Sequence, residues 1–424
     1  MGYNSGARAS IKFREDLINH IQNILFNEAF ANQCKIGDAS FSRRRKLNIS
    51  TLIVLLMHTF SKSIQRELDD FFQRLNQTEF LVRTVTKGAL TQARAKLKPE
   101  AFIMLDQVTQ EDFYKGAAIY RWGKYRVKAV DGSTIVLPNH HSIKEEFGEH
   151  KFGPNADSPR SMARISLLYD PLNGITNDAQ ISGYSTSEKE LCHLHIPKME
   201  PGDLIMFDRY YASLDLMWTL YKKKVDFLFR MKDNWWNVIQ EFQAEKKKDK
   251  IVDLDCKEGL IKVRLIKSTL PNGTVQVFCT SVLDKKFTPE DFGELYENRW
   301  GIEEAYKTLK NWIELENFSG KTSLAVRQDF YSKIFMMNLC SAFANPVAER
   351  IKKEKSEYQI NKVQGLAMMC VLPVPLFLKG HVSGAIKAFD NLISKTIDQI
   401  RPNRHFKRKK KPMKVKFSMN YKNL

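Results

Sequence analysis

Four polar residues near the end of one predicted helix have the spacing to bind a phosphodiester beside a metal ion: Tyr296, Arg299, Glu303 and Lys310. All four fall within an arc of roughly 60° when the segment is drawn as one α-helix. The phenol and the two cations can bind phosphate oxygens, and the carboxylate can bind a metal ion. The alternative is an ordinary solvated helix face that is held by Glu–Arg and Glu–Lys pairs.

Two further carboxylates, Asp131 and Asp208, lie in or directly after short apolar strands. A carboxylate at the end of a strand can project from the sheet into a cleft, although an aspartate taken singly is also typical of a turn. Together with Glu303 they form a set of hard oxygen ligands that suits Mg²⁺ or Mn²⁺ better than Zn²⁺. Two such ions, about 4 Å apart, would activate a water or a 3′-hydroxyl and stabilise the leaving oxygen.

These carboxylates need a sheet and a helix to hold them, and the sequence between residues 116 and 345 has the pattern of an α/β domain. Apolar runs near 125–138 and 162–183 predict strands, and further strands are expected at about 203–208 and 226–232. Residues 233–288 read as an all-β insertion, with a hairpin at Asn272-Gly273. A long amphipathic helix is expected from about Pro289 to Trp312.

Helical segments flank this predicted core on both sides. The sequence divides into a helical DNA-binding region, a core in two pieces, a β-rich insertion, a helical C-terminal region and a basic tail: 1–115, 116–232 with 289–345, 233–288, 346–400 and 401–424. Short basic helices such as 86–98 fit either a DNA-contacting domain or an ordinary helical domain.

The composition indicates a polyanionic partner. The chain has 67 Lys and Arg against 48 Asp and Glu, a net charge of +19, and nucleic acid is the commonest partner of such a protein. Its 6 cysteines form no C-x-x-C pair, so reduced thiols in a cytosol are expected. The longest apolar run, Leu52 to Met57, is too short to span a bilayer. We expect a soluble, cytoplasmic, nucleoid-associated protein without a membrane partner.

The pattern Tyr296-x2-Arg299-x3-Glu303-x6-Lys310 resembles the signature of DDE transposases from bacterial insertion sequences, the hairpin-forming cut-and-paste type. Three other segments agree with that family: the strand that holds Asp131-Gly132-Ser133, the later strand that ends in Asp208-Arg209-Tyr210, and the β-rich insertion. The resemblance covers about 40–345. It implies a ribonuclease-H-like core in which Asp131, Asp208 and Glu303 bind two metal ions and catalyse the reaction.

The resemblance also implies the substrates and the assembly. The enzyme would nick transposon terminal inverted repeats in double-stranded DNA and join the freed 3′-hydroxyl to target DNA, and a homodimer would hold the two ends. In this family a Trp of the β insertion stacks a flipped base during hairpin formation, for which Trp235 and Trp236 are the candidates here, unless they are core residues. Arg230 and Lys232 close a strand beside the expected cleft and are either phosphate contacts or surface charges.

Two other functions stay open: a transposase-derived DNA-binding protein that no longer cleaves, and a related nuclease without strand transfer. Gly320-Lys321-Thr322 lacks the earlier glycine and the preceding strand of a nucleotide-binding loop, so an ATPase is rejected. Cys192, His193 and His195 lie close together, but no fourth residue has the spacing of a zinc ligand.

Overall fold

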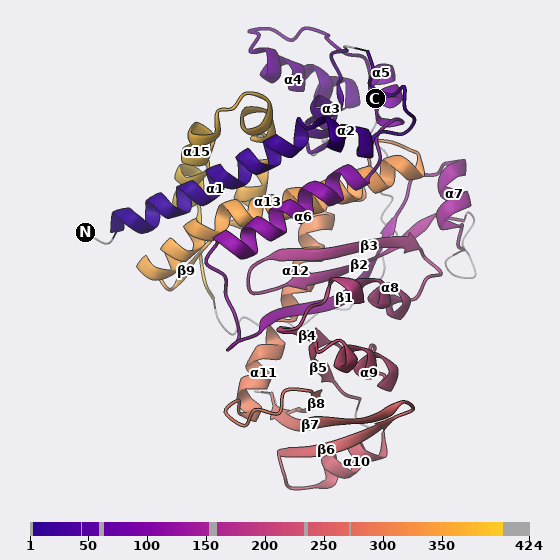
Figure 1. The fold of residues 1–424 in the computed structure, drawn as a ribbon, viewed down its shortest axis with the longest axis vertical. Helices are drawn as coiled ribbons and strands as arrows, with labels where there is room; N and C mark the ends of the chain where they lie inside the picture. The colour runs from indigo at the N-terminus through magenta and orange to yellow at the C-terminus, as the bar shows by residue number, and fades with distance from the viewer. Residues whose placement is uncertain are drawn as a thin grey trace. The chain divides into compact units, whose positions relative to one another are not determined.

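The structure is a computed structural model of the chain, and it describes residues 3–43, 45–58, 63–151, 159–232, 236–270 and 273–401. The predicted basic tail, except Arg401, lies outside these residues. The chain divides into two compact units (Figure 1). Unit 1 consists of Met1–Ala118, Ile135–Met162 and Thr308–Leu424, and unit 2 consists of Ile119–Thr134 and Ala163–Lys307.

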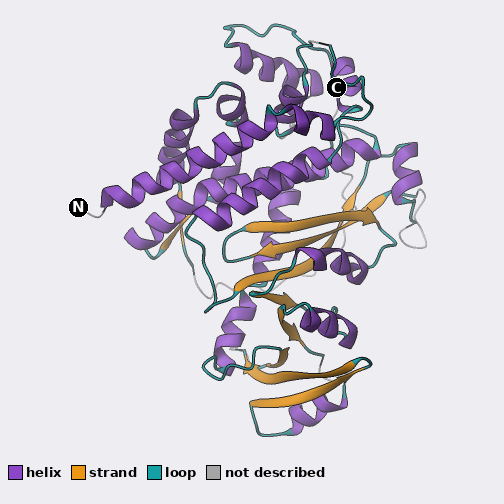
Figure 2. Ribbon diagram, in the orientation of Figure 1, coloured by secondary structure: helices purple, strands orange, loops and turns teal. Residues whose placement is uncertain are grey.

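Unit 1 is mainly helical (Figure 2). Its helices before the sheet are α1 (Tyr3–Leu25), α2 (Glu28–Cys34), α3 (Ile49–Leu56), α4 (Ile64–Asn76), α5 (Lys87–Arg94) and α6 (Glu100–Gly116). Its later elements are α7 (His141–Phe147), η2 (Thr308–Trp312), α13 (Ser323–Glu354), β9 (Tyr358–Ile360), α14 (Lys362–Met369), η3 (Val374–Leu378), α15 (Val382–Lys395) and β10 (Ile397–Gln399). Helices α1 and α13 both pack against α6, so the two ends of the chain share one core.

The longest helix, α13, has 32 residues and carries polar side chains into the interior of unit 1. Asp329, Lys333 and Asn338 are among its buried residues. Polar groups in such positions interrupt the apolar surface that a bilayer requires. No helix in the described part of the chain is both long and apolar enough to cross a membrane.

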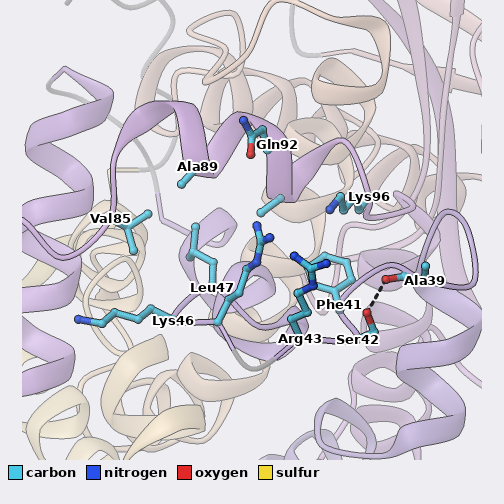
Figure 3. A pocket seen from close by; sticks show the side chains of 12 residues that line it. Ala39, Phe41, Ser42, Arg43, Lys46, Leu47, Val85, Ala89, Gln92 and Lys96 are labelled. Atoms are coloured by element: carbon cyan, nitrogen blue, oxygen red, sulfur yellow. Dashed lines mark hydrogen bonds between the residues drawn. The ribbon is translucent and has the colours of Figure 1, made fainter.

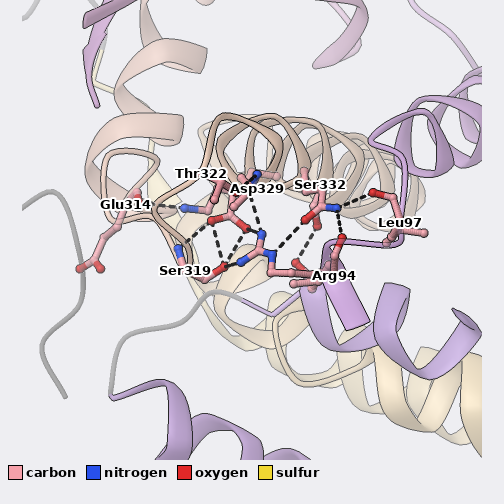
Figure 4. A network of polar contacts seen from close by, with 11 residues as sticks. Arg94, Leu97, Glu314, Ser319, Thr322, Asp329 and Ser332 are labelled. Carbon is pink, nitrogen blue, oxygen red and sulfur yellow. Dashed lines mark hydrogen bonds and ion pairs between the residues drawn. The ribbon is translucent and has the colours of Figure 1, made fainter. Parts of the chain in front are cut away.

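A buried arginine on α5 joins this helix to α13 (Figure 4). The Arg94 guanidinium donates to Gln328, Ser319, the Ala325 carbonyl and Asp329, over distances between 2.8 and 3.2 Å. Arg94 is 5 % exposed and Asp329 is 4 % exposed. Arg94 belongs to the segment 86–98, for which the sequence left open a DNA-contacting helix or an ordinary helical domain. The structure shows it as an internal anchor.

Unit 2 is built around an eight-stranded sheet. Its strands are β1 (Arg126–Val136), β2 (Met162–Asp170), β3 (Ile175–Gly183), β4 (Asp203–Phe207), β5 (Asp226–Arg230), β6 (Asp249–Cys256), β7 (Gly259–Thr269) and β8 (Val275–Thr280), in the spatial order β3-β2-β1-β4-β5-β8-β7-β6. Strands β1, β4 and β5 are parallel to one another, and β2 and β3 form an antiparallel hairpin. The order 3-2-1-4-5 with three parallel strands is the ribonuclease-H-like arrangement, so the predicted fold class is confirmed.

Five α-helices and a short 3₁₀ turn complete unit 2: α8 (Glu188–His195), η1 (Ile196–Lys198), α9 (Leu214–Lys222), α10 (Asn237–Ala244), α11 (Pro289–Glu297) and α12 (Trp300–Lys307). The apolar core of unit 2 includes buried side chains of β4, β5 and β7, such as Phe207, Phe229 and Val263. Side chains alternate along these strands, so the apolar faces of the core strands and of the inserted strands form a single surface.

The segment predicted as an all-β insertion is rich in strands, and it differs from the prediction in two respects. Its strands β6, β7 and β8 continue the core sheet beyond β5, because β8 pairs antiparallel with β5. It is not all-β, since Ile239 and Phe242, three residues apart, bury one face of the short helix α10. Gly273 has a φ of +82° in the turn between β7 and β8, as expected for the predicted hairpin, and Asn272 lies outside the described residues.

The predicted single helix from Pro289 to Trp312 is interrupted. Helix α11 ends at Glu297, where the Asn298 side chain donates to the carbonyls of Glu294 and Leu295, both at 3.2 Å. A side-chain amide that bonds to the preceding turn competes with the backbone ladder of a helix. Helix α12 then begins at Trp300 and passes into η2. The arc drawn for one straight helix is therefore wrong for this segment.

Candidate active site

The two candidate aspartates occupy matching positions on adjacent parallel strands. The register of β1 and β4 places Ala129 opposite Met206. Two residues further along each chain, Asp131 is level with Asp208, which directly follows β4. Adjacent strands lie about 4.8 Å apart. The sheet register therefore places these two carboxylates side by side at the carboxyl end of β4.

Arg299 connects the third carboxylate to this pair. Its Nη2 lies 3.2 Å from Oε1 of Glu303, and its Nη1 lies 3.7 Å from Oδ2 of Asp131. The guanidinium also lies over the rings of Tyr296 and Trp300, with centroids 5.6 and 5.4 Å away. Residues that are far apart in sequence thus meet around one buried cation.

The carboxyl group of Asp131 has a raised pKa. Burial raises its pKa from 3.8 to about 6, while the Gly132 amide at 2.9 Å and the charge of Arg299 lower it, and the charges of Asp208 and Glu188 raise it. A divalent cation would relieve both the desolvation and the repulsion, so this all-oxygen set fits such an ion. In the described ranges, no three His, Cys, Asp or Glu side chains already lie close enough together to form a metal site.

Two hydrogen bonds hold the backbone of Asp131 in place. Its carbonyl accepts hydrogen bonds from Tyr306 at 2.7 Å and from Ser166 at 3.2 Å. Ser166 Oγ lies 2.9 Å from His195 Nε2, and the other ring nitrogen lies 2.6 Å from Asp178 Oδ2. This buried polar chain fixes the position of β1 where the candidate carboxylate leaves it, and it employs both nitrogens of His195.

The remaining two residues of the four-residue pattern have different surroundings. Tyr296 is buried, which raises its pKa to about 12, and its hydroxyl donates to the Phe207 carbonyl at 3.3 Å. It thereby supports the end of β4 just before Asp208. Lys310 lies in η2 of unit 1, where burial lowers its pKa and Glu316 acts in the opposite direction. For both residues, direct phosphate contact stays a prediction.

A basic cavity of about 360 Å³ lies at the end of β5. Its lining residues are Arg209, Arg230, Met231, Lys232, Thr274, Val275 and Gln276. Arg230 and Lys232, two predicted phosphate contacts, thus share one cavity with Arg209. Trp236 is half-buried and packs against the core of unit 2, whereas Trp235 lies outside the described residues.

A second basic cavity, of about 390 Å³, lies in unit 1 between α5 and the segment before α3 (Figure 3). Its cations are Arg43, Arg45, Lys46 and Lys96, and none of them forms an ion pair with a described carboxylate. Apolar side chains, among them Leu47, Val85 and Ala89, complete the lining. Such a cavity can bind phosphate at its cations and sugar or base surface at its apolar side.

The sequence patterns missed several residues around Asp131: Ser166, Asp178, Glu188, Tyr211 and Tyr306. Each is distant in sequence from Asp131, and no short motif connects them. Local signals were present at three of them: Tyr211 directly follows Asp208-Arg209-Tyr210, Tyr306 lies between Glu303 and Lys310, and Glu188 follows Ser187 in the capping box of α8.

The fold and the motifs of this chain can be compared with those of known protein families. A family profile described as "Transposase DDE domain" matches residues 122–339, more than half of the 424 residues. The chain belongs to this family, and the resemblance inferred from its motifs is confirmed.

Two relatives come from Escherichia coli strain K12. InsZ, which carries the provisional name of transposase, is 25 % identical over 188 residues, 43 % of this chain and 60 % of InsZ. The transposase InsG of insertion sequence element IS4 is 22 % identical over 285 residues, 63 % of this chain and 63 % of InsG. The matches thus span less than two thirds of either relative. The piggyBac transposase synaptic complex with hairpin DNA aligns with 89 % of this chain and 85 % of its own, with a TM-score of 0.46 and 9 % identity.

Proposed function

We propose that this chain is a metal-dependent DNA transposase in which Asp131, Asp208 and Glu303 hold two Mg²⁺ or Mn²⁺ ions. The observation that carries the proposal is the meeting of Asp131 and Glu303 at Arg299, beside Asp208, within the segment that matches the DDE family. Bound ions of this kind activate a water or a 3′-hydroxyl and stabilise the leaving oxygen.

The protein's own groups orient the DNA and hold the carboxylates. Tyr306 and Ser166 fix the backbone of Asp131, and Tyr296 fixes the residue before Asp208. Arg299 keeps donors for a phosphate, because its contact with Asp131 is long and its Nε has no hydrogen-bond partner among the described residues. A guanidinium with free donors suits the planar, bidentate recognition of a phosphodiester.

Two basic cavities provide surfaces for double-stranded DNA. The cavity with Arg209, Arg230 and Lys232 binds phosphates in unit 2. The cavity with Arg43 and Lys96 binds the transposon ends, in line with a DNA-binding role for residues 1–115. Phosphate contacts of this kind position the duplex and make binding sensitive to salt.

The order of reaction steps follows from the family. One strand is cleaved at each terminal inverted repeat, the freed 3′-hydroxyl attacks the opposite strand to form a hairpin, and the reopened end joins target DNA. Two protomers act together because two ends are joined. The stacking role for Trp235 stays open, whereas the packing of Trp236 against the core favours a structural role for that residue.

The test uses a plasmid that carries the chain's own gene with its flanking sequences. Wild-type protein with Mg²⁺ should nick at the element ends. Glu303→Gln should keep DNA binding and lose cleavage, while Glu304→Gln, an exposed neighbour that pairs with Lys307, should cleave normally. Retained cleavage by Glu303→Gln would remove that residue from the mechanism.

The same assay separates the two alternatives. Wild-type protein that binds the ends and never nicks them with Mg²⁺ or Mn²⁺ would be a DNA-binding derivative. Protein that nicks DNA and yet fails to join pre-cut ends to target DNA would be a nuclease without strand transfer. Joined products with pre-cut ends support a transposase.

A further inference from the structure

A fourth carboxylate lies against β1, the strand that carries Asp131. Glu188 begins helix α8 directly after its capping residue, Ser187. Its Oε1 accepts a hydrogen bond from Arg164 Nη1 at 3.0 Å, and its Oε2 makes no hydrogen bond with a described residue. Arg164 thus holds one oxygen of Glu188 and leaves the other available.

Glu188 packs against Gly132, the residue that follows Asp131 in β1. A Cβ atom added at Gly132 would lie 2.5 Å from Cγ of Glu188 and 3.1 Å from its Oε1. Contacts below 3.0 Å are not tolerated, so any larger residue at 132 would displace the Glu188 side chain. Glu188 therefore occupies the space that a side chain at 132 would fill, and its charge is one of those that raise the pKa of Asp131.

A buried hydroxyl faces the same two carboxylates. Tyr211 is 1 % exposed, and its hydroxyl has no hydrogen-bond partner among the described residues. After burial, the strongest electrostatic influences on this phenol are Asp131 and Glu188. Buried polar groups are nearly always hydrogen-bonded, so this hydroxyl indicates a place where a ligand's atom is bound.

We propose that Glu188 is a fourth acidic ligand of the metal site, binding a divalent cation together with Asp131. The Tyr211 hydroxyl then hydrogen-bonds to a water or phosphate oxygen in the coordination shell of that ion. Divalent ions such as Mg²⁺ take six oxygen ligands, which carboxylates, waters and phosphates share, so a pair of ions has room for a fourth carboxylate. This inference rests on the proposed function, in which Asp131 binds metal.

The test measures Mn²⁺ binding by the full-length protein without DNA, by calorimetric titration or electron paramagnetic resonance. Glu188→Gln should weaken Mn²⁺ binding about tenfold or more. The matched control is Glu297→Gln, an exposed glutamate of α11, which should leave the affinity unchanged. Asp131→Asn tests the proposed site itself and should weaken binding at least as much.

Unchanged affinity in Glu188→Gln together with weakened affinity in Asp131→Asn would overturn this inference and leave the proposed function standing. Unchanged affinity in both variants would overturn the metal site at Asp131 and the inference with it. If Glu188→Gln unfolds, Glu188→Asp keeps the charge beside Arg164 and shortens the reach, and it should also weaken Mn²⁺ binding. Wild-type affinity in that variant would contradict the inference.

Tyr211→Phe distinguishes a hydroxyl that supports the fold from one that serves a bound ion. Removing a hydroxyl that supports the fold would lower the melting temperature measured with EDTA. Removing one that serves a bound ion should leave this temperature unchanged and weaken Mn²⁺ binding between about twofold and tenfold, the effect of one hydrogen bond. A lower melting temperature with unchanged Mn²⁺ affinity would contradict the role given to Tyr211.

Discussion

Two buried arginines, one in each compact unit, have opposite surroundings. Arg94 in unit 1 donates to two side-chain oxygens, one backbone carbonyl and the Asp329 carboxylate, all within 3.2 Å. Arg299 in unit 2 has one contact at 3.2 Å with Glu303, a longer one at 3.7 Å with Asp131, and an Nε without a partner among the described residues. Both residues are less than a tenth exposed.

The difference separates a cation that stabilises the fold from one that we propose to bind substrate. A buried charge is tolerated when it is paired and hydrogen-bonded, and each of the three guanidinium nitrogens of Arg94 donates at least one hydrogen bond. A buried guanidinium with unused donors is destabilising by itself, and such groups persist at sites where a ligand completes them. The environment of each arginine therefore predicts which property its removal will change.

The largest expected effect on stability comes from Arg94→Met. This change leaves Asp329 buried without its cation, and the free energy of unfolding should fall by about 3–5 kcal/mol. Urea denaturation followed by circular dichroism measures the loss. A loss below about 1 kcal/mol would show that Arg94 does not anchor α5 to α13, and Arg94 and Arg299 would then not differ in their contribution to stability.

Arg299→Gln should reduce cleavage more than stability, the reverse of Arg94→Met. Cleavage at the element ends should fall about 10²- to 10³-fold, as when a single charge-stabilising donor is removed from an active site. The free energy of unfolding should fall by less than in Arg94→Met, because Arg299 has fewer hydrogen bonds to lose. Single-turnover cleavage and urea denaturation of the same preparation give both values. A large loss of stability with normal cleavage would reverse the assignment.

The pH dependence of stability tests the environment of Asp131. Its pKa in the folded protein is raised to about 6, so its protonated form contributes stability below about pH 4, and this contribution is lost as the pH rises through 6. Without divalent ions, the free energy of unfolding should fall by up to about 3 kcal/mol between pH 4 and 7 on account of this group. Asp131→Asn should remove this component. Equal pH profiles for the two proteins would contradict it.

The smallest expected effect comes from an arginine that is neither anchored nor catalytic. Arg327, two residues before Asp329 on α13, pairs with Glu146 at the surface, where each side chain is about one third exposed. Arg327→Gln should lower the free energy of unfolding by about 1 kcal/mol or less. A loss as large as that of Arg94→Met would show that burial is not what distinguishes the two positions.

Local patterns predicted most elements of the fold. Apolar runs predicted strands of the core sheet, and the Asn272-Gly273 turn predicted the hairpin of β7 and β8. The break after Glu297 was missed, because the competing hydrogen bonds of the Asn298 side chain are not visible as periodicity. Helix α10 was missed because eight residues with two buried side chains give a weak helical pattern.

The types and order of the acidic residues, the basic charge and the family signature are properties of the chain alone, and they were sufficient to predict the fold class and the family. The tertiary structure decided which side chains meet. It placed Asp131 level with Asp208 through the pairing of β1 and β4, brought Glu188 over Gly132, and buried Arg94. Periodicity reports the neighbours of a residue along the chain, whereas strand register and burial are set by contacts between segments far apart in sequence.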